Sequence, residues 1–193
     1  MEEVKEKKQK LRKEMEKKLA LLPEAEILSR TDRIESQLFE FANFEESNVA
    51  LFYFMGDNTL NGGQILHHCS QMRKAIILPS LDGENRLKVW KVENLLNGLK
   101  PGKVLFDPDP ERCKPVTFDT IDIAIVQGVA FDEKGGRLGS GRGLYDRLAA
   151  KLPNTVRKVA LAIEEQIISH VPMESNDKFV DIIITDKRII YKI

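Results

Sequence analysis

Cysteine and long apolar runs are both scarce in this sequence. The chain of 193 residues has only two cysteines, Cys69 and Cys113, which lie far apart and form no C-x-x-C pair. That spacing gives neither a zinc-site pattern nor a disulfide framework, so we expect buried or idle thiols. No stretch approaches the roughly 18 apolar residues that a membrane-spanning helix needs, and residues 1–18 lack the apolar core of a secretion signal. We therefore expect a soluble, cytoplasmic protein with no membrane partner.

The chain also lacks an excess of charge of either sign. Thirty Lys plus Arg residues balance thirty Asp plus Glu residues, which gives a formal net charge of zero. A neutral chain is not built for bulk electrostatic capture of nucleic acid, so we expect no nucleic-acid partner. Hydrophobic residues make up 42% of the chain, enough for a packed interior. At roughly one domain per 150 residues, we expect a single domain over residues 1–193.

Hydrophobic periodicity predicts two helices at the start of the chain. Four apolar residues from Leu11 to Leu22 recur every three or four positions, which indicates an amphipathic helix over about residues 3–21. Pro23 ends this pattern, because proline interrupts a helix. A second helical pattern follows from Glu24.

Six short apolar runs predict the strands of a sheet. They occupy residues 48–54, 74–79, 86–92, 121–126, 158–163 and 180–185. Several of these runs are continuous rather than alternating, which indicates strands that are covered on both faces. A helical pattern over 60–71 supplies the crossover that parallel strands require. The expected fold is therefore α/β, with three layers, a largely parallel central sheet and helices on both of its faces. Residues 94–115, rich in Gly, Pro and Asp, indicate an extended connection.

The most informative stretch is a glycine loop between a predicted strand and a predicted helix. It reads VQGVAFDEKGGRLGSGRGLYDR from residue 126 to 147 and leads into a helical pattern over 144–152. Gly139, Gly141 and Gly143 alternate, which leaves backbone N–H groups unobstructed where the helix begins. Such an arrangement suits a phosphate group.

Charged residues surround this loop. Arg137, Arg142 and Arg147 add cations whose planar donor forks match phosphate oxygens. Asp146 is suited either to cap the helix or to hold a magnesium ion. The loop fits neither common nucleotide fingerprint, since Leu144 stands where the third glycine of G-x-G-x-x-G belongs. A tight turn that needs three positive φ angles, with merely solvated arginines, is the alternative.

Three separate segments form an ordered signature. They are KQKLR at 8–12, then GVAFD at 128–132 with RLG at 137–139 and G-x-G-x-G-L-YDR at 139–147, and finally VP at 171–172 with ND at 176–177 and VD at 180–181. Together they resemble the 5-formyltetrahydrofolate cyclo-ligase family, also called 5,10-methenyltetrahydrofolate synthetase. The resemblance implies an ATP- and magnesium-dependent conversion of 5-formyltetrahydrofolate to 5,10-methenyltetrahydrofolate, with release of ADP and phosphate.

The resemblance also assigns residues to roles. For ATP it implies contacts from Lys8, Arg12, Arg137, Leu138, Gly139, Ser140, Gly141, Arg142, Gly143, Leu144 and Tyr145. For the reduced folate it implies Tyr53, Asn58, Ser140, Gly141, Arg142, Gly143 and Leu144. Catalytic roles fall on Arg142 and Tyr145, and magnesium ligation falls on Asp146 and Asp177. The expected assembly is a monomer or weak homodimer.

Local sequence alone favours plainer interpretations of several of these residues. Lys8 and Arg12 suit the solvated face of a helix, and Asp177 suits a turn. Tyr53 suits a buried strand. Only the resemblance gives these four residues a functional role.

The chain departs from the family pattern mainly on the substrate side. Ser140 and Leu144 replace tyrosines whose rings could stack on a pteridine or adenine. Asn58 replaces a glutamate after the first strand, and an amide cannot supply a carboxylate's charge. Gln127 replaces the proline of P-G-x-x-F-D. An alternative is therefore a divergent paralogue that binds nucleotide in a regulatory role or acts on a different substrate. An RNA-binding module is a weaker alternative, because no aromatic platform accompanies the arginines.

Overall fold

An eight-stranded central sheet organises the protein. The computed structural model describes residues 2–54, 60, 62–72, 74–100 and 107–192. The strands are β1 (Val49–Tyr53), β2 (Ala75–Leu81), β3 (Leu87–Val92), β6 (Lys114–Val116), β7 (Ile123–Val126), β10 (Arg157–Leu161), β11 (Ile182–Ile184) and β12 (Ile189–Tyr191). Their order in the sheet is β12-β11-β10-β7-β1-β2-β3-β6. The five strands from β11 to β2 are parallel, and β12, β3 and β6 are antiparallel additions at the two edges.

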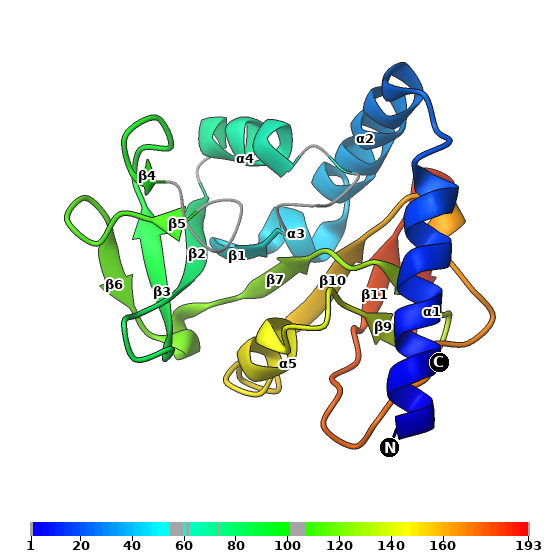
Figure 1. The fold of residues 1–193 in the computed structure, drawn as a ribbon. Coiled ribbons are helices and arrows are strands. Elements are labelled where there is room, and N and C mark those ends of the chain that lie inside the picture. The colour runs from blue at the N-terminus through cyan, green and yellow to red at the C-terminus, as the bar shows by residue number, and fades with distance from the viewer. Residues whose placement is uncertain (1, 55–59, 61, 73, 101–106, 193) are drawn as a thin grey trace.

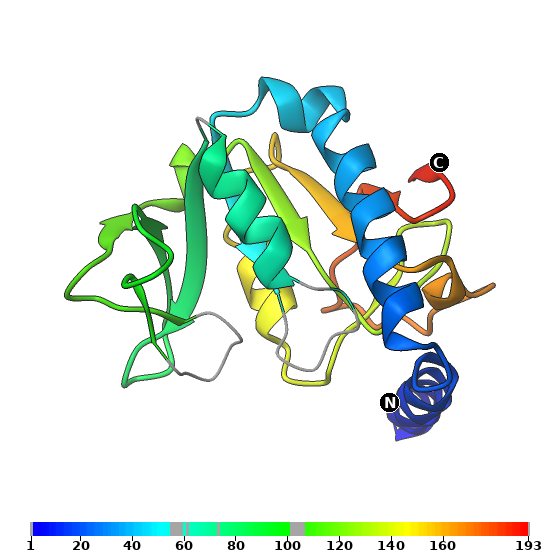
Figure 2. The same cartoon turned by 90° about the horizontal axis from the view of Figure 1, so that it is seen from above.

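Helices cover both faces of this sheet. They are α1 (Glu2–Leu19), α2 (Glu24–Phe39), α3 (Ala42–Glu46), α4 (Gly62–Gln71) and α5 (Leu144–Ala149), with 3-10 turns η1 (Phe118–Thr120) and η2 (Glu164–Gln166). Leu38 of α2 and Leu66 of α4 belong to the core on one face, together with Phe52 of β1. Leu148 of α5 belongs to the core on the other face, with Leu51 of β1. Figures 1 and 2 show α2 and α4 on one side and α5 on the other, so the predicted three-layer α/β fold is confirmed.

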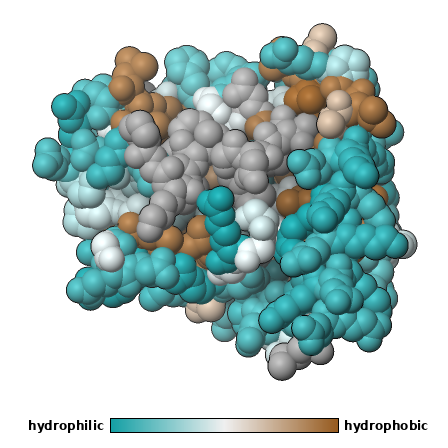
Figure 3. Space-filling view, viewed as in Figure 1, coloured by the Kyte–Doolittle hydropathy of each residue, from teal (hydrophilic) through white to brown (hydrophobic). Residues whose placement is uncertain are grey.

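Helix α1 packs at one side of the molecule rather than on the sheet. Its apolar residues Leu11, Met15 and Leu19 contact a small cluster that includes Leu138 and Val171. The rest of the helix is hydrophilic, and Figure 3 shows this side of the molecule covered by hydrophilic residues. Of the helices that the structure describes, none is long and apolar enough to cross a membrane.

Most predicted elements are confirmed, and the shortest ones were missed. The sequence did not predict α3, the edge strands β6 and β12, or the two-residue strands β4 (Leu99–Lys100), β5 (Asp107–Pro108), β8 (Ala130–Phe131) and β9 (Arg137–Leu138). β4 and β5 pair inside the predicted extended connection, whereas β8 and β9 pair within residues 126–147, the glycine segment. The helix predicted over 144–152 ends at Ala149.

The strand order reverses between β1 and β7. The chain proceeds from β1 to β2 on one side of this pair and from β7 to β10 on the other side. Tyr53 pairs with Val126, so the carboxyl ends of β1 and β7 lie level at one edge of the sheet. Ligands of open parallel sheets bind at such a reversal point, outside the carboxyl ends of the strands. The topology therefore makes the edge of the sheet beside Tyr53 the candidate position for a ligand.

Two substitutions in α2 test which face of this helix packs against the sheet. Leu38 is 0% exposed, so we expect Leu38→Ala to lower the free energy of unfolding by about 2–5 kcal/mol, since it leaves a cavity. Leu28, on the same helix, is 41% exposed, and Leu28→Ala should change the free energy of unfolding by less than about 0.5 kcal/mol. Urea unfolding measures both variants. Equal losses would contradict this assignment of the buried face.

Candidate functional site

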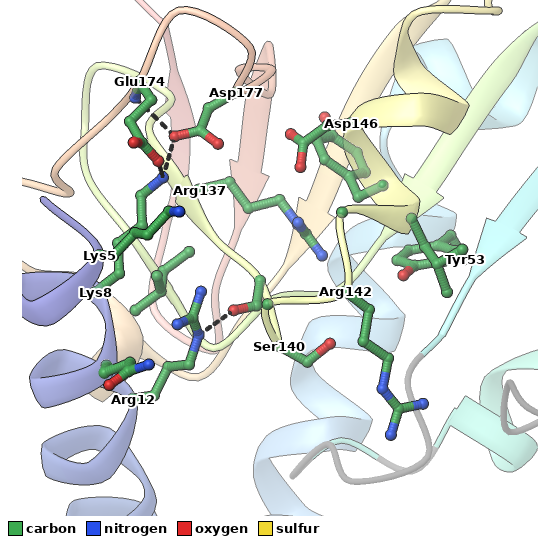
Figure 4. Close-up of a pocket in the computed structure, with 17 residues that line it drawn as sticks. Lys5, Lys8, Arg12, Tyr53, Arg137, Ser140, Arg142, Asp146, Glu174 and Asp177 are labelled. Atoms are coloured by element: carbon green, nitrogen blue, oxygen red, sulfur yellow. Dashed lines mark hydrogen bonds and ion pairs between the residues drawn. The ribbon is translucent and has the colours of Figure 1, made fainter. Parts of the chain in front are cut away.

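A cavity of about 300 Å³ lies at the carboxyl edge of the sheet, between α1 and the glycine loop. All the predicted nucleotide, catalytic and metal residues line it: Lys8, Arg12, Arg137, Leu138, Gly139, Ser140, Gly141, Arg142, Gly143, Leu144, Tyr145, Asp146 and Asp177. Tyr53 lines it as well, and Figure 4 shows how these side chains converge from α1, the loop and the C-terminal segment. Asn58 lies outside the described residues.

Three further residues line the cavity that sequence reasoning missed: Lys5, Gln9 and Glu174. Lys5 lies three residues before Lys8, and Gln9 lies three residues before Arg12. Residues at this i,i+3 spacing share one face of a helix. That spacing could have identified them. Glu174 carries no comparable local signal, because its role depends on a contact with α1.

The glycine loop needs glycine for two different physical reasons. Gly141 and Gly143 have positive φ angles of 95° and 62°, which most side chains rarely adopt. Gly139 does not, but a Cβ atom there would lie 2.7 Å from Nη1 of Arg137. The predicted turn with three positive φ angles is therefore wrong at Gly139, where close packing is the constraint. Gly143 begins α5.

Arg137 is a buried cation in the wall of the cavity. Its Nε and Nη2 donate to the carbonyl of Gln127 at 2.9 and 2.6 Å. Its guanidinium lies 4.1 Å from the ring centroid of Tyr145 and 5.9 Å from that of Tyr53. Burial lowers the pKa of Arg137, although arginine remains charged near neutral pH. The two rings and the carbonyl thus hold a fixed positive charge at the cavity.

Tyr145 supports that arginine from a fixed position. It is 2% exposed, and its hydroxyl donates to the carbonyl of Phe179 at 3.0 Å. Burial raises the pKa of Tyr145, and the nearby charge of Arg137 offsets this only in part. The hydroxyl therefore stays protonated, and the ring positions Arg137.

Lys8 is held between two carboxylates. Its Nζ donates to Oε2 of Glu174 at 2.8 Å and forms a second ion pair with Asp177. The same Asp177 oxygen accepts the backbone N–H of Glu174 at 2.7 Å. Burial acts to lower the pKa of Lys8, but hydrogen bonds to both carboxylates outweigh it and raise the pKa. The interpretation of Lys8 as a solvated helix residue is therefore wrong.

Arg12 joins α1 directly to the glycine loop. Its Nε donates to the carbonyl of Gly139 at 2.7 Å. Burial lowers the pKa of Arg12, and the negative charge of Asp177 acts in the opposite direction. The contact fixes the distance between the helix and the loop, so both line the same cavity.

Two carboxylates face the cavity on the side opposite to Ser140. Asp146 and Asp177 both line the cavity, and Figure 4 shows both of them above Arg137 in this view. Oδ1 of Asp146 accepts the backbone N–H of Lys178 at 2.9 Å. Within the described ranges, no three His, Cys, Asp or Glu residues are grouped to hold a metal ion. A pair of carboxylates nevertheless fits magnesium, which usually takes its other ligands from phosphates and water.

The three arginines of the glycine segment lie in different places. Arg137 is buried in the cavity wall, and Arg142 is exposed at the cavity beside Ser140. Arg147 does not belong to the lining, and its Nη1 donates to the carbonyl of Asn85 at 3.2 Å. The prediction that Arg147 adds a cation around the phosphate loop is therefore wrong. It lies on the outward side of α5.

Asp132 holds the glycine segment against the C-terminal segment, a role that sequence reasoning missed. It is 3% exposed, and its carboxylate accepts the backbone N–H groups of Lys134, Gly136 and Val171. A Cβ atom on Gly136 would lie 2.5 Å from Oδ2 of Asp132. The F-D pair at residues 131–132 could have pointed to this buried acceptor.

Comparisons with known proteins agree with this geometry. A model described as the 5-formyltetrahydrofolate cyclo-ligase family matches residues 4–186. A protein of Schizosaccharomyces pombe named probable 5-formyltetrahydrofolate cyclo-ligase is 27% identical over 201 residues, covering 97% of this chain and 98% of that protein. The solved structure of a 5,10-methenyltetrahydrofolate synthetase from Aquifex aeolicus is 28% identical, with a TM-score of 0.82 over 96% of this chain and 92% of that one.

A second solved structure extends the likeness in fold. The 5,10-methenyltetrahydrofolate synthetase of Mycoplasma pneumoniae has a TM-score of 0.71 over 93% of this chain and 98% of that one, at 18% identity. None of these relatives supports the alternative of a regulatory paralogue. Because the family model covers nearly the whole chain, this protein belongs to the 5-formyltetrahydrofolate cyclo-ligase family.

Proposed function

We propose that this protein converts 5-formyltetrahydrofolate to 5,10-methenyltetrahydrofolate, using ATP with magnesium and releasing ADP and phosphate. One observation carries the proposal. A single cavity gathers the glycine loop, the cations of Lys8, Arg12 and Arg137, and the carboxylates of Asp146 and Asp177. Family membership supplies the substrate and the reaction. We further propose that the chain acts as one domain in the cytoplasm, as a monomer or weak homodimer.

The glycine loop and the surrounding cations suit the phosphates of ATP. Residues Gly139–Gly143 leave the backbone open to close approach, since three of the five lack a side chain. Arg12 and Arg137 are already fixed by hydrogen bonds to backbone carbonyls, so little side-chain freedom is lost when a phosphate binds. Lys8 adds an ammonium group on the side of Asp177.

Asp146 and Asp177 are the residues that would hold magnesium. Magnesium bound there would neutralise phosphate charge and help to align the terminal phosphoryl group. Asp177 carries an ion pair with Lys8, so magnesium held by Asp177 would compete with that ion pair. Lys8, which also bonds Glu174, would then have hydrogen-bonding capacity for a phosphate oxygen.

Ring closure requires that a poor leaving oxygen become a good one. In the proposed reaction, the formyl oxygen of the substrate accepts the terminal phosphoryl group of ATP, and ADP is released. N10 then attacks the formyl carbon and gives up its proton to solvent, and phosphate leaves with the original formyl oxygen. Arg142 is the proposed catalytic cation for the charge on the transferring group. Tyr145 acts through Arg137, because its hydroxyl is protonated and bonded to Phe179.

The reduced folate would lie beside Tyr53, at the reversal point of the sheet. Tyr53 lines the cavity with its ring near that of Tyr145, at 6.3 Å between centroids. Ser140, Gly141, Arg142, Gly143 and Leu144 would contact it from the loop. Asn58 stays a prediction on the substrate side.

An absorbance assay tests the activity. Purified protein with ATP, magnesium and 5-formyltetrahydrofolate should develop the near-ultraviolet absorbance of the methenyl product. ATP binding without that absorbance would favour the alternative of a paralogue with another substrate or a regulatory role.

Asp146→Asn tests the proposed metal role. The amide keeps the acceptor for the N–H of Lys178 but loses the charge, so the fold should persist. We expect the affinity for ATP in the presence of magnesium to fall by roughly tenfold or more. A loss of this size is typical even for residues that only hydrogen-bond to a metal ligand. Calorimetric titrations with and without magnesium measure this, with the exposed Asp119→Asn as control. An unchanged magnesium dependence would remove Asp146 from this role.

Arg142→Ala tests the proposed catalytic cation. Loss of one positioned donor to a charged transition state lowers kcat by about 100-fold. The matched control is Arg147→Ala, five positions along, which should change kcat by less than about twofold because Arg147 does not line the cavity and donates to the carbonyl of Asn85 outside it. Initial rates from the absorbance assay compare the two variants. Similar losses in both would contradict the assignment.

A further inference from the structure

Two buried glutamines differ in how their amides are satisfied. Gln127 and Gln166 are both 0% exposed. Nε2 of Gln166 donates to the carbonyls of Gly128 and Val129, and its Oε1 accepts the N–H of Ile163. Neither Nε2 nor Oε1 of Gln127 has a hydrogen-bond partner in the part of the chain that the structure describes. A buried amide without partners is destabilising, and folded proteins keep very few of them.

Gln127 lies at the point where the strand order reverses. It follows β7 directly, and its backbone N–H donates to the carbonyl of Tyr53 at 3.2 Å. Its own carbonyl accepts both hydrogen bonds from Arg137. Tyr53 and Arg137 both line the cavity, so the backbone of Gln127 is bonded to two parts of the cavity wall. Gln127 itself does not line the cavity, and its side chain is buried.

The chemistry of the unpaired amide indicates its ligand. A glutamine side chain presents an acceptor oxygen and an N–H donor next to one another. The lactam edge of a pterin ring presents a ring N–H beside a carbonyl oxygen, so the two can form a pair of hydrogen bonds. Because the amide gives up no hydrogen bond when it leaves its buried position, pairing with a ligand has no such loss to offset. The side chain has three rotatable torsions with which to reach the cavity.

We propose that Gln127 is a substrate-binding residue whose amide recognises the lactam edge of the pterin ring. This inference rests on the proposed function, which supplies the pterin. A role in substrate binding explains why the chain keeps an unpaired amide that destabilises the fold, at a position where the sequence pattern of the family has a proline. It also makes Gln127 a specificity residue, because a site that pairs with a substrate's polar edge rejects ligands that lack it.

Gln127→Met is the first test, since methionine has a similar length and no amide. We expect the melting temperature of the ligand-free protein to stay the same or rise, because an unpaired buried amide is removed. The Kd of 5-formyltetrahydrofolate, measured by calorimetry without ATP, should rise by about tenfold or more. The Kd of ATP should change less than about twofold. Gln166→Met is the control and should lower the melting temperature, because it breaks three hydrogen bonds.

A pair of pterin ligands identifies which edge is recognised. The probe is the 4-deoxo analogue of the substrate, in which a hydrogen atom replaces the carbonyl oxygen of the lactam, so that the amide can form only one hydrogen bond with this edge. The natural chain should bind this analogue more weakly than the 4-oxo compound by about tenfold, and Gln127→Met should bind both alike. A preference that survives in Gln127→Met overturns the proposal.

The remaining outcomes separate this inference from the proposed function. An unchanged Kd for 5-formyltetrahydrofolate in Gln127→Met overturns the role of the amide alone and leaves the proposed function intact. A natural chain that binds ATP but neither pterin overturns the proposed function, and the role of Gln127 with it.

Discussion

The parallel pairing of β7 with β1 on one side and β10 on the other determines where chemistry can be placed in this protein. Val126 at the end of β7 pairs with Tyr53 of β1 and with Ala160 of β10. Three strands therefore end at one level, and the segments that follow them leave the sheet at one edge. The glycine loop returns to that edge through the β8–β9 pair, which brings Arg137 back against the carbonyl of Gln127.

The second determinant is the set of ion pairs and hydrogen bonds between α1 and the rest of the protein. Apolar packing of Met15 and its neighbours positions the helix, and its polar contacts then complete the cavity. Lys8 reaches the carboxylates of Glu174 and Asp177, and Arg12 reaches the loop at Gly139. Charges that we propose face a metal and phosphates are thus held by contacts within the protein. The cavity is organised before any ligand arrives.

Much of the fold could be predicted from the sequence, because its main elements have strong periodic signals. Long helices such as α2 repeat apolar residues on one face, and continuous apolar runs such as residues 121–126 indicate strands buried on both sides. The failures share a physical cause. α3 and β8 are too short for a period to be seen, and the antiparallel direction of β3 depends on its pairing with β2 rather than on its composition.

Cavity-lining residues could be predicted where a local sequence pattern identifies them. They could not be predicted where their place in the cavity depends on contacts with distant parts of the chain. Glycines next to arginines pointed to the loop, and the family signature added Lys8 and Asp177, all of which line one cavity. Local sequence could not separate Arg142 from Arg147, because only the direction of α5 turns one toward the cavity and the other away. Nor could it identify Glu174, whose partner lies on the first helix.

The ion pair between Lys8 and Asp177 joins residues 169 positions apart. Closing so long a loop is entropically demanding, so the sheet must first bring the two segments near one another. During synthesis the first helix is made long before its acceptor, and until the C-terminal segment is made Lys8 has neither of these carboxylates to bind. The end of the cavity next to α1 is consequently one of the last parts of the molecule to assemble, and it is complete only when the N-terminal and C-terminal segments have both folded.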